Sequence, residues 1–194
     1  MISTLKGFVV TAAALVLWGC GSESTGPKSQ VQTLNGVEYV ALEGAAFKQG
    51  DGLVEGTGKM LFLKPLTNPD NNFDLQMNLG KSGSACLVSM SDALLNAGLK
   101  VCFVSEDGRN LKVSLHEGAS VQDISNLFVP VASSADDLSV SMDIHGHGHL
   151  VFWLNGGEEV EVPFTLRPTG TLWGLILTDA RVQKSIQGPA KEAH

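Results

Sequence analysis

Apolar and polar residues alternate with a period of two along much of the chain. In the clearest segment, residues 138–144, every second residue is apolar, and the residues between are Ser139, Ser141 and Asp143. This alternation predicts a β-strand with one face in a core. We expect the apolar set to face that core and the three polar residues to face water.

Two further segments extend this pattern toward the C-terminus. Residues 150–154 are apolar, and residues 155–157 read Asn-Gly-Gly, which is a strong hairpin signal. In the next strand, residues 158–164, Glu159 and Glu161 lie on the face opposite the apolar residues. The three segments together predict an antiparallel meander with one buried face.

The rest of the chain also favours strands over helices. Further strand candidates are residues 37–42, 59–63, 73–79, 86–90, 99–104, 111–115 and 172–177. Short strands separated by turns, in a chain with 22 glycines and 7 prolines, predict an all-β antiparallel sandwich or barrel. Only residues 91–97 and 120–127 could hold a turn or two of helix, the second with Ser120 as N-cap.

Two of the three cysteines fall in one predicted hairpin. If this hairpin is centred on residue 94, Cys86 lies directly opposite Cys102. Residues opposite one another on paired strands are close enough for a disulfide. The alternative is a pair of buried free thiols.

The N-terminus carries an export signal. Lys6 precedes an apolar run, residues 7–17, which is about half of the roughly 20 residues that a membrane span needs. The sequence Leu17-Trp18-Gly19-Cys20 resembles the lipobox of bacterial lipoproteins, although Trp18 is bulkier than the usual small residue. The resemblance implies a signal peptide over residues 1–19 and acylation of Cys20.

The lipoprotein resemblance also divides the chain. Residues 20–34 are mostly small and polar and are expected to form a lipidated, flexible linker. Residues 35–187 would form the β-sandwich domain, and residues 188–194 a disordered tail. Because Gly21 rather than Asp follows Cys20, the resemblance implies the outer membrane more than the inner one.

Charge limits the partners. The net charge is −7, and removal of residues 1–19, which carry Lys6 and no acidic residue, makes it −8. A negative chain without a basic run is unsuited to nucleic acid. It is equally unsuited to binding anionic lipid by charge, so the membrane contact is expected through the acyl chains on Cys20.

From Leu138 onward the chain resembles the later half of concanavalin A-like jelly rolls, the class of lectins, glucanases and laminin-G domains. The resemblance rests on the strand pair 138–144 and 150–154, the turn at residues 153–156, and the closing segments 170–175 and 180–182. It implies a jelly-roll β-sandwich that binds a glycan or another envelope component. The Glu-x-Asp-x-x-Glu string of the glucanase branch is absent, so no catalytic residue is assigned.

Trp153 and Asn155 are the candidate ligand-binding residues. Phe152 and Leu154 share one face of their strand, so Trp153 points the other way. An indole on the second face of a sheet is a natural platform for a sugar ring, and Asn155 lies in the adjacent turn. The alternative is that Trp153 packs against a second layer.

Two groups of residues have the spacing of metal ligands. His145, His147 and His149 could bind zinc or copper. The interleaved glycines predict a turn that would splay these rings, so a closed site would need a further ligand such as Asp143. The alternative is that the histidines are ordinary exposed turn residues.

The second group offers oxygen ligands. Asp70, Asn72 and Asp74 have the alternate spacing of the first ligands of a calcium loop. The glycine and closing glutamate of such a loop are missing. The alternative is a plain turn rich in Asn, Asp and Pro.

These features favour a non-catalytic envelope lipoprotein that binds a glycan or envelope component. A second hypothesis is a structural or assembly subunit whose sheet packs on a protein partner. A third is a glycan hydrolase with Glu159 and Glu161 as paired carboxylates, for which the alternative is an ordinary solvated strand face.

Overall fold

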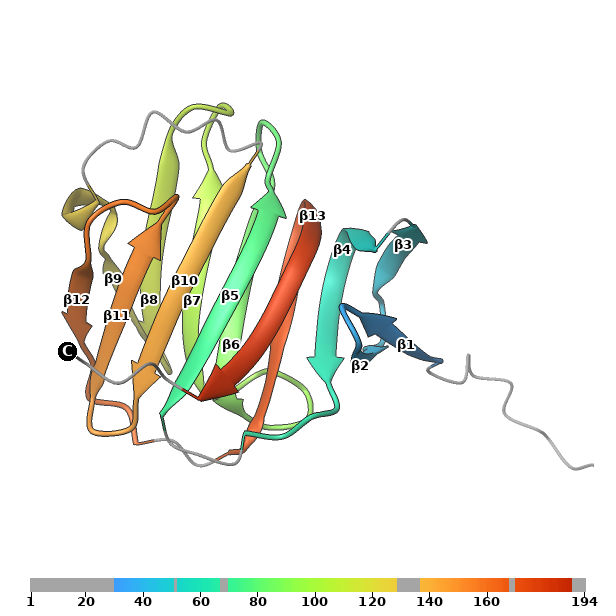
Figure 1. Cartoon of the computed structure of the whole chain (residues 1–194), viewed down its shortest axis with the longest axis horizontal. Helices are drawn as coiled ribbons and strands as arrows, with labels where there is room; N and C mark the ends of the chain where they lie inside the picture. The colour runs from blue at the N-terminus through green and yellow to red at the C-terminus, as the bar shows by residue number, and fades with distance from the viewer. Residues whose placement is uncertain (1–29, 51, 67–69, 129–136, 168–169, 190–194) are drawn as a thin grey trace, which may run out of the picture.

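The computed structural model describes residues 30–50, 52–66, 70–128, 137–167 and 170–189. Over these residues the chain folds into thirteen antiparallel strands and one 3-10 turn (Figure 1). The strands are β1 (Val31–Leu34), β2 (Val37–Ala41), β3 (Ala46–Gly50), β4 (Leu53–Phe62), β5 (Asn71–Asn78), β6 (Ser84–Ser91), β7 (Leu99–Ser105), β8 (Leu111–Glu117), β9 (Ser120–Asp123), β10 (Leu138–His145), β11 (His149–Leu154), β12 (Val160–Pro163) and β13 (Leu172–Pro189). The predicted all-β class is confirmed.

The sheet curls into two packed layers (Figure 1). Its main path runs β12-β11-β10-β5-β13-β6-β7-β8-β9, and β4 pairs with β13 as well. The front layer holds β12, β11, β10 and β5, and the back layer holds β6 to β9. The long strand β13 belongs to both, since residues 172–178 pair with β6 and residues 181–189 pair with β5.

A single large core fills the space between the layers. Its side chains come from alternate positions of both layers, including Leu75, Met142 and Phe152 in front and Leu87, Val101 and Val113 behind. Trp173 is fully buried in it, stacked on Phe62 with ring centroids 4.0 Å apart. The indole N–H of Trp173 donates to the carbonyl of Lys64 at 2.8 Å, so the buried polar atom is satisfied.

The β6–β7 hairpin has the predicted register and the predicted disulfide. Cys86 lies directly opposite Cys102, their Cα atoms are 4.0 Å apart, and the sulfurs are bonded. The alternative of two free thiols is therefore excluded.

Several boundaries differ from expectation. β1 occupies the last four residues of the predicted linker, because Leu34 is buried in the core. β13 reaches Pro189 because its second half pairs with β5. Residues 120–127 form β9 and a 3-10 turn (Ser125–Leu127), without an N-cap from Ser120, because β9 pairs with β8.

The predictions for residues 1–19 and for acylation at Cys20 lie outside the described residues, as does most of the predicted linker. The same is true of residues 190–194 of the predicted tail. Among the residues that the structure describes, no helix is long and apolar enough to cross a membrane.

Candidate functional site

The predicted meander forms, and it carries the candidate site on one face. β10 pairs with β11, and β11 pairs with β12, all antiparallel. The surface of the front layer that points away from the core is called the outer face below. It is built from the alternate residues of β11, β10 and β5 that do not enter the core.

Trp153 lies on the outer face, near the end of β11. It is partly exposed, whereas Phe152 and Leu154 on either side of it are buried in the core. Ser141 is directly opposite Trp153 on β10, and Asp74 is opposite Ser141 on β5. The Ser141 hydroxyl is buried and has no hydrogen-bond partner among the described residues. One row across the outer face thus holds the indole of Trp153, the buried hydroxyl of Ser141 and the carboxylate of Asp74.

A polar hollow of about 160 Å³ opens next to this row. It is lined by Gln76, Met77, Asp137, Leu138, Ser139 and Gln183. Ser139 pairs with Gln76, and this pair lies two residues along the strands from the pair of Ser141 with Asp74. Residues two apart on a strand point to the same side, so the hollow lies on the outer face as well. The register of β13 shifts between Val182 and Lys184, which makes Gln183 the extra residue of a β-bulge. Bulges commonly re-aim a side chain in this way.

Asn155 has a role in the turn. Its backbone adopts φ +49°, a left-handed conformation that Asn tolerates. Its side-chain oxygen accepts the backbone N–H of Ser139 at 2.7 Å, which ties the β11–β12 turn to the start of β10. The carboxamide oxygen of this candidate ligand-binding residue is therefore already engaged.

Asp143 is buried, contrary to the expectation that it faces water. It points to the outer side as the alternation predicts, but only 2% of it is exposed. The side-chain amide of Asn72, directly opposite on β5, donates to its carboxylate at 2.6 Å. A hydrogen bond to the charged oxygen offsets part of the cost of burial.

The three clustered histidines converge instead of splaying. His145 ends β10 and lies directly opposite His149 at the start of β11. Their rings stack with centroids 4.5 Å apart, and the ring of His147 lies 4.2 Å from His149 and 5.5 Å from His145. Gly148 allows this tight turn with φ +112°, and a Cβ there would lie 2.9 Å from the carbonyl oxygen of Phe164.

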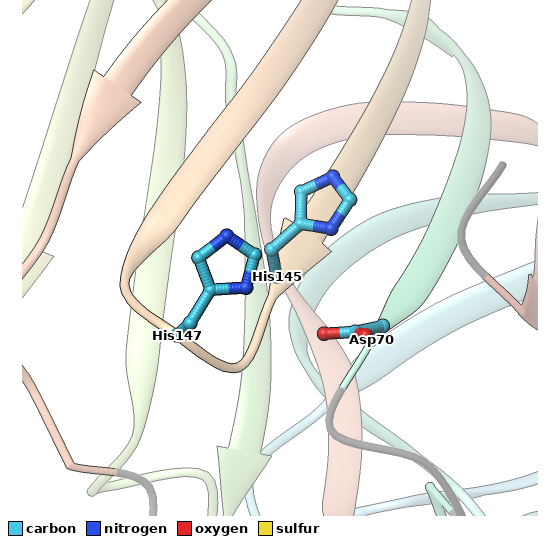
Figure 2. Close-up of side chains that lie close together, drawn as sticks. All are labelled: Asp70, His145 and His147. Carbon is cyan, nitrogen blue, oxygen red and sulfur yellow. The ribbon is translucent and has the colours of Figure 1, made fainter. Parts of the chain in front are cut away.

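The carboxylate that joins the histidines is Asp70, not Asp143. Figure 2 shows Asp70 beside His145 and His147, and one ligand atom from each of the three lies within 4.8 Å of the others. Because Asn71 pairs with Ile144, the strand register brings Asp70 next to His145. Asp70 also accepts the backbone N–H of Gly146 at 2.7 Å.

The three candidate calcium ligands do not form one oxygen site. Asn72 is hydrogen-bonded to Asp143, Asp74 lies in the row of Trp153, and Asp70 belongs to the histidine cluster. Alternate residues of a strand are about 7 Å apart, so three such side chains cannot surround one ion from one strand. The calcium prediction gains no support from this geometry.

Within the histidine cluster, the surroundings of His149 favour its neutral ring. Burial, and then the neighbouring imidazoles of His145 and His147, hold the pKa of His149 below its ordinary value. The carboxylates of Glu161 and Asp70 act in the opposite direction and are outweighed.

Glu159 and Glu161 are both exposed. Glu159 precedes β12, and Glu161 lies in it opposite Val151. Their exposure is what the alternative of a solvated strand face predicts.

Sequence reasoning missed Asp70 as a partner of the histidines, and it missed the residues of the polar hollow. The alternation in β10 does place Ser139 on the outer face. However, Gln76 and Gln183 reach the hollow through the pairing of β5 with β10 and β13, and through a bulge. No local pattern encodes those pairings.

No protein-family model matches the sequence, and a search of curated proteins finds no match. Solved structures do match. The carbohydrate binding module CBM66 from Bacillus subtilis has a TM-score of 0.55 at 11% identity, over 74% of this chain and 91% of that one. The Ca2+/Man3GlcNAc-bound VIP36 exoplasmic/lumenal domain has a TM-score of 0.57 at 12% identity, over 77% of this chain and 84% of that one.

The receptor binding domain of botulinum neurotoxin type G also matches, with a TM-score of 0.51 at 9% identity over 84% of this chain and 47% of that one. Similarity at these identities concerns the fold. The chain therefore has a concanavalin A-like jelly-roll fold, as the resemblance in its C-terminal part implied.

Proposed function

We propose that this protein is a non-catalytic glycan-binding module, and that the glycan lies on the outer face across Trp153 and the polar hollow. The observation that carries the proposal is the juxtaposition, on one face, of the partly exposed indole of Trp153 with the partly exposed carboxylate of Asp74 and the polar hollow. Sugar rings have an apolar face that packs on aromatic rings and a rim of hydroxyls that need hydrogen-bond partners.

The polar hollow supports the same use. Its carboxamides, carboxylate and hydroxyl come from Gln76, Gln183, Asp137 and Ser139. At about 160 Å³ it is smaller than pockets that enclose a ligand, which measure about 300–1,000 Å³. A shallow polar hollow beside an indole suits one unit of a longer chain that lies along the surface. Two of the similar solved structures are a carbohydrate binding module and a domain in a Ca2+/Man3GlcNAc-bound form, which makes glycans the first ligand class to test.

The protein would act at the cell envelope. Signal peptide cleavage and acylation at Cys20 would tether the domain to a membrane, and the absence of Asp at position 21 favours the outer one. The glycan would then be a polysaccharide of the envelope or of the cell's surroundings. No step of this role requires catalysis.

The proposal is tested by measuring the binding of the full chain to a glycan array. The protein is kept in a detergent without a sugar headgroup, so that the detergent does not compete for the site. Trp153→Ala is expected to weaken the strongest binding at least about tenfold, because stacking area is lost. Gln76→Ala should weaken it less. Leu94→Ala, which truncates an exposed apolar side chain on the β6–β7 connection, is the matched control and should bind as the wild type does.

Unchanged binding in Trp153→Ala, with the fold intact by circular dichroism, would contradict the proposed site. No binding across the array would contradict glycan recognition itself. That result would favour the hypothesis of an assembly subunit. Crosslinking in the native envelope would then be used to find its protein partner.

A further inference from the structure

The histidine cluster is a second candidate site, and it is separate from the proposed glycan surface. His149 and Trp153 are four residues apart on β11, which corresponds to about 14 Å. The cluster therefore lies at one end of the outer face, and Trp153 with the polar hollow lies toward the other.

We propose that Asp70, His145 and His147 bind a zinc ion. These residues come from two segments, 75 positions apart in the chain, that the β5–β10 pairing places side by side (Figure 2). One ligand atom from each lies within 4.8 Å of the others. Ligand atoms around a tetrahedral zinc ion, with bonds of about 2.0–2.1 Å, are roughly 3.4 Å apart. Small side-chain rotations close that difference.

The chemistry of the three ligand atoms favours zinc over calcium. Two imidazole nitrogens and one carboxylate oxygen suit zinc and related transition ions. Calcium requires six to eight oxygen ligands, and Asp143, the carboxylate two residues before His145, is buried against Asn72. Three protein ligands leave a fourth tetrahedral position for water.

The surroundings hold the ligands in place. The backbone N–H of Gly146 donates to the carboxylate of Asp70, and such contacts orient metal ligands. His149 stacks on His145 and meets the edge of His147, so it packs against both nitrogen ligands. Gly148 gives the turn the conformation that brings His147 back over the strands.

The bound ion would add a further link between two segments that strand pairing and the hydrogen bond from Gly146 to Asp70 already connect. It would link the turn between β10 and β11 to the segment that enters β5. The inference does not depend on glycan binding, since none of the three ligands lies in the row of Trp153 or in the polar hollow.

The test is isothermal titration of the full chain, without a histidine tag, with zinc chloride alone. The wild type is expected to bind one zinc ion per chain with a Kd of about 10 µM or tighter. His147→Ala and Asp70→Asn should each weaken binding at least about tenfold. His147 is exposed in the turn, and an asparagine at position 70 still accepts the Gly146 N–H, so both variants should keep the fold.

His116→Gln is the matched control, because it removes a described histidine outside the cluster and should leave the affinity unchanged. Cobalt(II), which replaces zinc and absorbs visible light, provides a second readout. Its absorption with the wild type should be lost in His147→Ala. Absence of zinc binding in the wild type, or equal binding in His147→Ala, would overturn the proposal.

Discussion

His116 illustrates how a single side chain couples this fold to pH. It lies half-buried on β8, directly opposite Lys100 on β7 and Val121 on β9. Burial, and then the nearby Lys100 ammonium, lower the pKa of His116 below its ordinary value. The hydrogen bond between the Ser114 hydroxyl and the ring, at 3.0 Å, gives the neutral imidazole a partner. The folded state therefore resists protonation that the unfolded chain accepts.

Stability should consequently fall as the pH falls. Above the unfolded pKa of about 6.5 both states hold a neutral ring, and this group adds no pH dependence. Below it the unfolded chain binds more protons, so the free energy of unfolding decreases until the lowered pKa of the folded state is passed. His116→Gln should lose less stability than the wild type between about pH 7.5 and about pH 5.

Urea unfolding of both proteins at the two pH values measures this difference. His149, whose pKa is also lowered, remains in both proteins and provides a constant background. An equal loss of stability in the two proteins would show that His116 does not carry the effect.

At the scale of elements, the disulfide links two neighbouring strands of the back layer. Cys86 in β6 and Cys102 in β7 close a short loop, with a sequence separation of 16. Such a link limits the conformations of the unfolded chain. Replacement of both cysteines by alanine should lower the free energy of unfolding by about 3 kcal/mol.

Denaturant unfolding of this double variant, in parallel with chemically reduced wild type, checks the value. The two should agree, because both remove the link and keep the strand pairing. A double variant as stable as the oxidised wild type would contradict the expected contribution of the link.

The same elements show what could be predicted from the sequence. The position of Cys86 opposite Cys102 follows from one short hairpin, in which the turn sets the register. The convergence of Asp70 on the histidines depends on pairing between β5 and β10, which no neighbouring residues specify. The burial of Asp143 has the same origin, because Asn72 reaches it from β5. Local strands and hairpins were therefore predictable, whereas sites assembled across distant strands were not.

At the scale of the whole molecule, the proposed attachment to a membrane would depend on one predicted modification. The net charge of −7 disfavours binding to anionic lipid, so the acyl chains expected on Cys20 would provide the attachment. Cys20→Ala should move the protein from the membrane pellet to the soluble envelope fraction. Cell fractionation, with mass spectrometry of the N-terminal peptide, measures both the location and the modification.

The Cys86→Ala/Cys102→Ala double variant is the control for the loss of a cysteine as such, and it should remain in the pellet. Pelleting of Cys20→Ala at the wild-type level would contradict the predicted anchor. An unmodified Cys20 in the wild type would contradict it as well.

The long strand β13 has a consequence for how the protein is made. It pairs with β4, β5 and β6, and it carries Trp173 into the core. A chain is synthesised from its N-terminus, so these partners emerge before the strand that joins them. Both layers stay incomplete until β13 has left the ribosome. The two-layer fold therefore cannot be completed before residues 172–189 emerge, and an incompletely folded polypeptide is what the predicted export signal would require for passage through a narrow channel.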